Sequence, residues 1–568
     1  MPAKSSFLLR LRLALRAGHD DLHGLLWQAA LVGVAGACAI LAFREALAWA
    51  ELLLYGRSDS LVAAAASLPP WLRMSIPAVG GVVAGGFIVL ARRLRTDVAN
   101  DYMEAISLRD GAISTRLSLT RSAASLASIA SGGSIGREGS MVQLASLGGF
   151  LFARWRALPA PQRRLLVACG GAAGIAAAYN APIAGTLFIA EIVLRTISIE
   201  ILGPLVAASV VSAIVSHVFF GAEALYALPP IHAPEGFALA AHALLGVLAG
   251  LAAPLFMGSL DAARAAFRRL PDHPPLRLGL GGLLVGLISV WLPQVWGNGY
   301  SVVNGMLAGQ WLWQALLVLL AFKVLATAIT IGSGAIGGAF TPSLFVGAAL
   351  GTLFGTAAQA LGATSEVPVY VVSGMAAFLA ATLHAPLTAI VIVVEMTGNL
   401  ALLPPVMLAS VIALALSRLL RARSIYGDSL KPLPARSFAR RTVAEVRRDG
   451  PPVVQAGEPL AAIQQAYAAS RWQHIYVVDA AGVFLGAVSI HALGELLLPQ
   501  HGAASLPPEQ LRRDYPRLLL DAPLTEALGV FGGHSGERLP VLDGDGRLRG
   551  YASKTDLMLL LGEEMAAV

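Results

Sequence analysis

The chain has 568 residues, of which 56% are hydrophobic and only 13% are charged. Soluble domains carry about 25% charged residues, so most of this chain is expected to lie in a membrane. The net charge of +7 comes mainly from arginines at the ends of apolar segments, which argues against nucleic-acid binding. Cys38 and Cys169 both lie in apolar stretches, so no disulfide framework is expected.

Residues 1–24 are predicted to form an N-terminal amphipathic segment on the cytoplasmic side. Between residues 5 and 16, Leu and Phe alternate with Arg, which favours an interfacial helix over a cleavable signal peptide. About a dozen apolar segments follow between residues 25 and 420, and many contain Gly or Pro. Residues 75–90 and 332–342 are examples of segments predicted to be broken. Broken spans are tolerated only where the freed backbone lines a cavity enclosed by protein, so these breaks predict a cavity.

Residues 131–140 read SGGSIGREGS, and they place the carboxylate of Glu138 inside an apolar region. A charged side chain there costs about 2.5–3.5 kcal/mol on insertion scales, so it indicates a functional site. Glycines let the backbone approach a ligand closely, and the residues from Ser140 onward are predicted to be helical. A Gly-rich turn before a helix N-terminus favours an anion. Glu138 is therefore interpreted as a tethered anion in an anion site, which suggests a gate.

The apolar region contains an internal repeat. Residues 170–182 match residues 374–386 at an offset of 204, and residues 133–136 match residues 334–337 at an offset of 201. Interrupted segments at corresponding positions of two halves point to a binding site near the middle of the membrane. The alternative is that runs of small residues only pack helices closely against each other.

Several polar and aromatic residues of the apolar region have more than one reading. Glu191 and Glu395 are equivalent in the repeat, and a structural role in holding interrupted backbone is favoured for both. Lys323 would either offset Glu395, attract anions or extend its charge to a helix end. Trp291 and Trp296 are predicted to be interfacial anchors.

After the last apolar segment the composition changes to a soluble α/β pattern that occurs twice. Residues 474–489 and 538–553 each contain an apolar strand, a turn with Asp and Gly, and a second strand before a helix. Residues 502–516 are rich in Pro and polar residues and read as a linker. The two modules are therefore placed at residues 439–500 and 515–566.

Four motifs, in this order along the chain, resemble those of the CLC family of chloride channels and chloride/proton exchangers, closest to its bacterial B-type branch. They are Gly136-Arg-Glu-Gly139, the stretch from Tyr179 to Glu191, Gly338-Ala-Phe-Thr-Pro342, and Tyr426 in Ser-Ile-Tyr. The first motif ends on Ser140 where the family has proline. The tail resembles a pair of CBS modules.

This resemblance covers residues 25–430 and implies the fold class. We expect an all-α polytopic membrane protein with two inverted repeats and broken re-entrant helices, followed by a small cytoplasmic α/β CBS pair. The repeat halves would span about residues 25–220 and 237–425. The resemblance also implies a homodimer in the lipid bilayer of a bacterial inner (plasma) membrane, with both termini in the cytoplasm.

The resemblance further assigns roles to single residues. Glu138 would be the gating glutamate, which leaves the outer anion site when it is protonated or displaced by chloride. The helix after Gly338 is expected to begin beyond Pro342, because proline suits a first helical turn. The residues implied in anion binding are Gly136, Arg137, Gly139, Gly338, Ala339, Phe340 and Tyr426.

Two departures from the family pattern bear on selectivity and coupling. Where many members supply a serine ligand, this chain has Thr96-Asp-Val-Ala-Asn100, so the third anion ligand is open. An ionised Asp97 would repel an anion, which favours a local shift of register. Exchangers often carry a glutamate as the inner proton relay just after the Glu191 position, but Ile192 stands there and cannot carry a proton.

The second CBS module contains Ser553-Lys-Thr-Asp556, which fits the family's ribose-contacting pattern. The first module has Ser489-Ile-His-Ala492 instead and lacks the acid. The resemblance thus implies at most one well-formed site for an adenine nucleotide such as ATP or AMP. The alternative is that Ser553 only caps the following helix.

Three classes of function remain open. The first is chloride transport through a glutamate-gated pore, either as channel-like voltage-gated conduction, which we favour, or as a chloride/proton antiporter. The second is a fluoride- or nitrate-selective relative, and the third is a membrane enzyme or a nucleotide sensor. No phosphate loop and no nucleophile-plus-base motif stands out, so an enzyme is not expected. His19 and His23 have a spacing that could bind metal on a helix, but they read as part of a solvated capping stretch, so no metal site is expected.

Overall fold

The computed structural model describes most of the chain. The described residues are 22–57, 60–94, 99, 101–107, 109–221, 224–232, 236, 238–427, 441–470, 472–492, 506–534 and 536–566. The predicted interfacial helix between residues 5 and 16 lies outside them. The chain divides into two units, Met1–Leu430 and Lys431–Val568, and each is described by itself.

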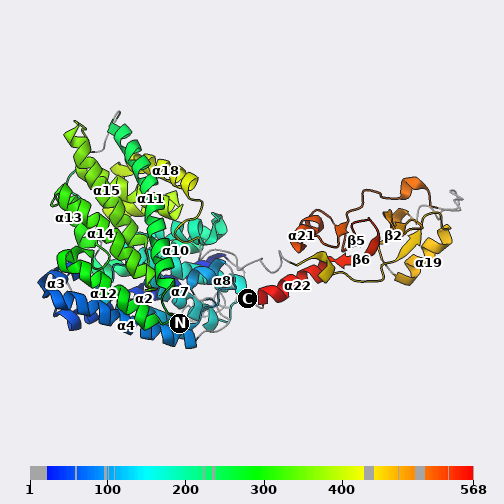
Figure 1. The fold of residues 1–568 in the computed structure, drawn as a ribbon, viewed down its shortest axis with the longest axis horizontal. Coiled ribbons are helices and arrows are strands. Elements are labelled where there is room, and N and C mark those ends of the chain that lie inside the picture. Colours follow the sequence, from blue (N-terminus) through cyan, green and yellow to red (C-terminus); the bar gives the residue numbers. More distant parts are fainter. Residues whose placement is uncertain are drawn as a thin grey trace, which may run out of the picture. The chain divides into compact units, whose positions relative to one another are not determined.

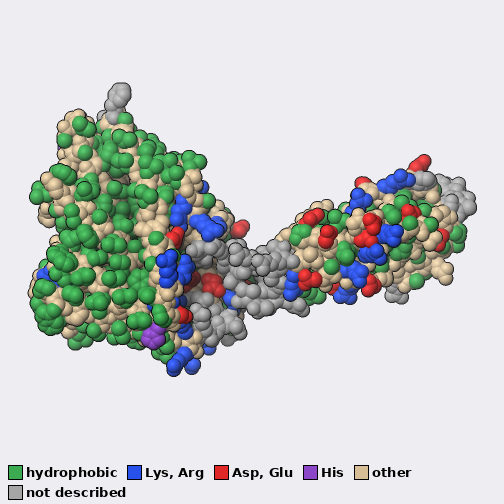
Figure 2. All heavy atoms as spheres, in the orientation of Figure 1, with side chains coloured by type: hydrophobic (Ala, Val, Ile, Leu, Met, Phe, Trp, Pro, Cys, Tyr) green, Lys and Arg blue, Asp and Glu red, His purple; other side chains and the backbone are tan. Residues whose placement is uncertain are grey.

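The first unit is a bundle of helices (Figure 1). Among the described residues, eight helices are long and apolar enough to cross a membrane. They are α2 (Leu22–Tyr55), α4 (Pro70–Arg93), α10 (Ile199–Phe220), α11 (Ala238–Arg268), α12 (Pro274–Trp291), α14 (Trp313–Gly332), α15 (Phe340–Ala360) and α18 (Leu403–Leu420). Hydrophobic side chains cover most of the visible face of this unit (Figure 2), as expected of a surface that meets lipid.

Nine further helices complete the described part of this unit. They are α3 (Leu61–Ser67), α5 (Tyr102–Ser107), α6 (Thr115–Ala130), α7 (Glu138–Trp155), α8 (Ala160–Tyr179), α9 (Pro182–Phe188), α13 (Tyr300–Leu307), α16 (Val367–Leu383) and α17 (Pro386–Thr397). Single turns of other helix types lie at η1 (Ile189–Leu194), η2 (Pro293–Val295) and η3 (Leu400–Leu402). The predicted all-α polytopic architecture is confirmed.

Helix α4 corrects one prediction, because it runs without a break through Pro77. Two of its glycines serve packing instead. A Cβ on Gly81 would come within 2.2 Å of the Leu278 carbonyl oxygen, and one on Gly85 within 2.4 Å of Pro275 Cα. The small residues of α4 therefore let its backbone lie directly against α12, which is the packing alternative considered for such runs. The break predicted at residues 332–342 is present, between α14 and α15.

The two repeat halves meet in an antiparallel contact. Gly136 N donates to Gly338 O and Gly338 N donates to Gly136 O, each at 2.9 Å. Gly132 and Gly334 share a φ of +100°, and α7 and α15 begin at Glu138 and Phe340. All three pairs differ by 202, so the offset of 201 read from the sequence was wrong by one residue. The other offset, 204, is confirmed at the left-handed residues that end α8 and α16, Asn180 and His384.

Glu191 and Glu395, the equivalent glutamates of the two repeat halves, each cap a short helix of the other half. Glu191 accepts hydrogen bonds from the backbone N–H groups of Leu387 and Thr388, at 3.2 and 2.8 Å. Glu395 accepts them from Ile183 and Ala184, at 3.0 and 2.8 Å. Each carboxylate thus satisfies N–H groups at the start of the opposite short helix, α17 or α9. The predicted structural role of both glutamates is confirmed.

The second unit contains two copies of one α/β arrangement. The first has β1 (Val453–Gln455), α19 (Leu460–Ser470), β2 (His474–Val478) and β3 (Phe484–Ser489). The second has β4 (Leu518–Leu519), α21 (Leu524–Gly532), β5 (Arg538–Leu542), β6 (Leu548–Ser553) and α22 (Lys554–Ala566). In both sheets the first pair of strands is parallel and the second antiparallel. The turns η4 (Val443–Glu445) and η5 (Pro508–Gln510) lie before and between the copies.

Each copy also pairs with a segment outside its own strands. Val443 N donates to Ala522 O and Leu524 N to Arg441 O, which joins the start of this unit to the second copy. Arg512 and Ala487 exchange backbone hydrogen bonds, so a residue of the predicted linker extends the sheet of the first copy. The two copies are thereby held in one unit.

Candidate functional site: a cavity at the meeting point of two helix N-termini

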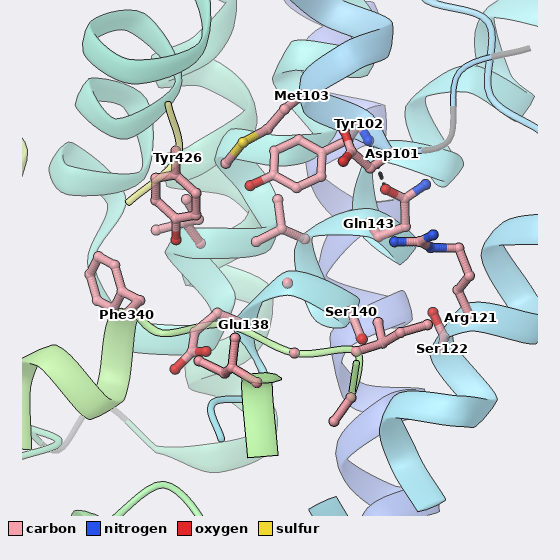
Figure 3. A pocket seen from close by; sticks show the side chains of 18 of the residues that line it. Asp101, Tyr102, Met103, Arg121, Ser122, Glu138, Ser140, Gln143, Phe340 and Tyr426 are labelled. Carbon is pink, nitrogen blue, oxygen red and sulfur yellow. Dashed lines mark hydrogen bonds between the residues drawn. The ribbon is translucent and has the colours of Figure 1, made fainter. Parts of the chain in front are cut away.

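A cavity of about 430 Å³ lies inside the membrane unit (Figure 3). It is lined where α5, α7 and α15 begin and where the chain leaves α18. Of the residues predicted to form the site, the cavity brings together Glu138, Gly139, Gly338, Phe340 and Tyr426. The cavity expected from the broken spans is therefore present.

Glu138 is the first residue of α7, two residues earlier than the predicted helix start. Its side chain is 7% exposed, and both carboxylate oxygens are buried without a hydrogen-bond partner among the described residues. The carboxylate fits against glycine backbone: a Cβ on Gly136 would lie 1.9 Å from Oε2, and one on Gly338 would lie 2.6 Å from it. Glycine at both positions is what gives this carboxylate its place.

Two helix N-termini flank the carboxylate. Arg137 precedes α7, and Ala339 precedes α15, which begins at Phe340 rather than after Pro342 as predicted. Pro342 still lies in the first turn, where its missing N–H costs no hydrogen bond. The helices have 18 and 21 residues, so both N-termini carry a partial positive charge and free N–H groups that favour an anion.

Aromatic rings form the apolar wall of the cavity. The Phe188 ring lies 6.3 Å from that of Phe340 and 5.9 Å from that of Tyr426. Tyr179 lies 5.1 Å from Phe340, and its hydroxyl is 3.3 Å from Thr341 Oγ1. The Tyr426 backbone is positioned by its neighbour, because Ile425 N donates to Thr382 O at 3.0 Å. The Tyr426 side chain reaches the cavity (Figure 3).

Other predicted site residues lie elsewhere. The Arg137 side chain lines a second cavity, of about 230 Å³, where its guanidinium lies 5.7 Å from the centre of the Tyr300 ring. Gly136 and Ala339 are adjacent to the main cavity but do not line it. Ile192 is buried in η1 and does not line it either. The segment proposed for the third ligand, 96–100, lies outside the described residues except for Ala99.

The structure also decides one reading of Lys323 and places the two tryptophans. Lys323 is 1% exposed, and its Nζ donates to Val295 O and Gly297 O at 2.8 and 2.7 Å. It therefore does not extend to a helix end. Trp296 is fully buried, and a Cβ on Gly132 would come within 2.5 Å of its ring, so the predicted interfacial position was wrong. Trp291 is 73% exposed, which agrees with an interfacial anchor.

The sequence interpretation missed several residues that line the cavity, among them three next to each other in Figure 3. Tyr102, Asp101 and Gln143 all do so, and none belongs to a motif that indicated a site (Figure 3). The only available signal was the position of Asp101 and Tyr102, immediately after the segment that departs from the family pattern.

In the C-terminal unit, Ser553 and Asp556 bind each other. Ser553 Oγ accepts from Asp556 N at 3.0 Å and donates to Asp556 Oδ2 at 2.7 Å, so Ser553 caps α22. Arg448 lies 2.6 Å from Asp556 Oδ1. Partial burial raises the pKa of Asp556, but the hydrogen bonds from Arg448 and Ser553 outweigh it and hold the pKa below its usual value.

Among the described residues, no cluster of three or more His, Cys, Asp or Glu could hold a metal ion. A multi-pass membrane protein whose two inverted halves meet at a buried glutamate between helix N-termini has the build of an anion transport protein. Residues 80–418 match the voltage-gated chloride channel family, and the chain belongs to this CLC family. Residues 509–563 match the CBS domain.

Relatives agree with this assignment. A ClcB-like chloride channel protein of Ralstonia nicotianae is 49% identical over 71% of this chain and 95% of its own length. The voltage-gated ClC-type chloride channel ClcB of Citrobacter koseri is 42% identical over 70% of this chain and 97% of its own. Among solved structures, a slow cyanobacterial Cl⁻/H⁺ antiporter is 25% identical with a TM-score of 0.64, covering 72% of this chain and 97% of that one. A eukaryotic CLC transporter has the same fold, with a TM-score of 0.62 at 18% identity over 94% of this chain and 97% of that one.

Proposed function

We propose that this protein conducts chloride passively through a pore that Glu138 gates. The observation that carries the proposal is the place of its carboxylate, buried between Gly136 and Gly338 where the N-termini of α7 and α15 meet. Chloride attracted to the same N–H groups competes with the carboxylate for that place. When Glu138 withdraws, the anion passes between the apolar wall and the hydroxyl of Tyr426.

We further propose that chloride movement is not obligatorily coupled to protons. The support is Ile192, because a hydrocarbon side chain at the position of the inner relay cannot exchange a proton. Coupled exchange is the second candidate, and it is supported by the structural similarity to a Cl⁻/H⁺ antiporter.

The test is to record anion and proton fluxes together from protein in liposomes under a chloride gradient. We expect chloride to move down its gradient without uphill proton movement, and Glu138→Gln to keep chloride flux while removing its dependence on pH. Glu200→Gln, at an exposed position in the first turn of α10, is the matched control and should behave as the wild type.

Uphill proton movement that disappears in Glu138→Gln would contradict passive conduction and show that the protein is a chloride/proton exchanger. Repeating the flux with fluoride and nitrate tests the anion: transport of either with no chloride flux would overturn the substrate.

The remaining proposals concern assembly and regulation. We propose a homodimer in a bacterial inner membrane, with both termini in the cytoplasm and with the CBS pair as a regulator. An adenine nucleotide would use Ser553 and Asp556 of the second CBS copy. Its ribose would have to replace the ion pair between Asp556 and Arg448.

A further inference from the structure

Tyr102 is a second tyrosine whose side chain lies on the main cavity. It begins α5, directly after the segment where many family members supply a serine ligand. Its ring is 6% exposed, and Figure 3 shows its phenol end directed toward the side of the cavity that Tyr426 occupies. Glu138, Tyr102 and Tyr426 thus line one cavity from three separate parts of the chain.

A hydrogen-bonded amide fixes the backbone of Tyr102. The Gln143 side chain accepts from Tyr102 N through Oε1 at 2.7 Å and donates to Ser118 Oγ through Nε2 at 2.8 Å. Asp101 also holds the start of α5, because its Oδ1 accepts from Glu104 N at 2.8 Å. The Tyr102 hydroxyl itself has no hydrogen-bond partner within the part of the chain that the structure describes. The main chain is therefore anchored while the hydroxyl stays available to a ligand.

The chemistry of the cavity wall shows what such a hydroxyl can do. The apolar part of the cavity lining, formed by Val142, Ile175, Phe188 and Phe340, cannot replace the water that an entering anion loses. Polar groups of Arg121, Ser122 and Gln143 line other parts of the same cavity. A donor to an ion is roughly twice as strong as a donor to a neutral group. The hydroxyls of Tyr102 and Tyr426, which come from distant parts of the sequence, are two such donors. Two donors of this kind are suited to a weakly hydrated, singly charged anion.

We propose that the Tyr102 hydroxyl is an anion ligand of this pore and binds chloride together with Tyr426. The inference rests on the proposed chloride pathway and deepens it, because it names a donor from the side where the family's serine is missing. Gln143 is then a positioning residue that sets the place of the Tyr102 backbone.

The experiment is chloride titration by calorimetry into purified full-length protein exchanged into a buffer without halide. Tyr102→Phe removes only the hydroxyl, and we expect chloride to bind about ten-fold more weakly, as expected when one hydrogen bond to an ion is lost. Tyr426→Phe should weaken binding similarly. Tyr370→Phe is the matched control, because the Tyr370 hydroxyl is buried without a partner among the described residues and does not line the cavity.

Each outcome separates the two proposals. If the wild type binds and conducts chloride and Tyr102→Phe binds it equally well, the role of Tyr102 is overturned while the pore stands. If the wild type neither binds nor conducts chloride, the proposed function itself fails. Melting temperatures without chloride distinguish a ligand from a structural role: Tyr102→Phe should melt as the wild type does, and a large drop would indicate that the hydroxyl supports the fold instead.

Discussion

At the scale of single residues, the site depends on what is absent as much as on what is present. The carboxylate of Glu138 occupies space that side chains at Gly136 and Gly338 would fill. Neither glycine has a positive φ, so the backbone conformation alone does not require them. Because glycine has no Cβ, both positions leave room beside the backbone for the Glu138 carboxylate. The place of the gating side chain therefore depends on the absence of a side chain at these two residues.

This dependence predicts the effect of one added methyl group. In Gly136→Ala the new Cβ would lie 1.9 Å from Glu138 Oε2, so the carboxylate must leave its place. Chloride flux at neutral pH should rise toward that of Glu138→Gln, and combining the two substitutions should add little. Chloride efflux from liposomes measures the flux of the single and double variants.

Gly148→Ala, on the helix α7 that follows Gly136, is the control for Gly136→Ala. Its Cβ would lie 3.6 Å from that of Ala35, an ordinary contact, so flux should not change. An unchanged gate in Gly136→Ala would contradict the assignment of the carboxylate to this place.

At the scale of elements, the long helices and the short helices are held in place in different ways. Helices α4 and α12 lie backbone to backbone through small residues, whereas α9 and α17 begin with N–H groups that Glu395 and Glu191 satisfy across the repeat. Without water in a bilayer core, unpaired N–H groups cost several kcal/mol each, so the exchange of carboxylates keeps the short helices in place.

Two neighbouring glycines on α4 test the packing. Gly85→Ala would bring a Cβ within 2.4 Å of Pro275 Cα and should separate α4 from α12, lowering the melting temperature in detergent. Gly86→Ala meets nothing within 4 Å and should be neutral or stabilise by up to about 1 kcal/mol through helix propensity. Equal melting temperatures for the two variants would show that this contact does not hold the helices together.

At the scale of the whole molecule, the pore and the tail are separate units. All the residues that line the main cavity lie in Met1–Leu430. The pore should therefore not need the CBS pair for conduction itself.

A truncation after Leu430 should keep chloride flux in liposomes, with any nucleotide response lost. A truncation after Arg423, which also removes Tyr426, should lose most of the flux. If the protein truncated after Leu430 is folded but conducts no chloride, the tail is part of the transport machinery rather than its regulator.

The sequence predicted much of this molecule where the signal is local. Glu138 and Tyr426 were found because a charge in an apolar run and a short motif are visible without a fold. Trp296 was misread because Gly132, against which it is buried, is remote in sequence. The role of Lys323 stayed open for the same reason, since the two carbonyls that its Nζ contacts lie in a remote loop around η2. Tyr102 was missed for the same reason: only the fold brings α5 to the cavity.

The antiparallel bridge between Gly136 and Gly338 also bears on how the protein is made. The ribosome adds Gly338 202 residues after Gly136, which takes about 10–40 s at usual rates of synthesis. During that interval Glu138 is already in the nascent chain, while the glycine that completes its surroundings does not yet exist. The final surroundings of the Glu138 carboxylate can therefore form only after the second half of the membrane unit has been synthesised.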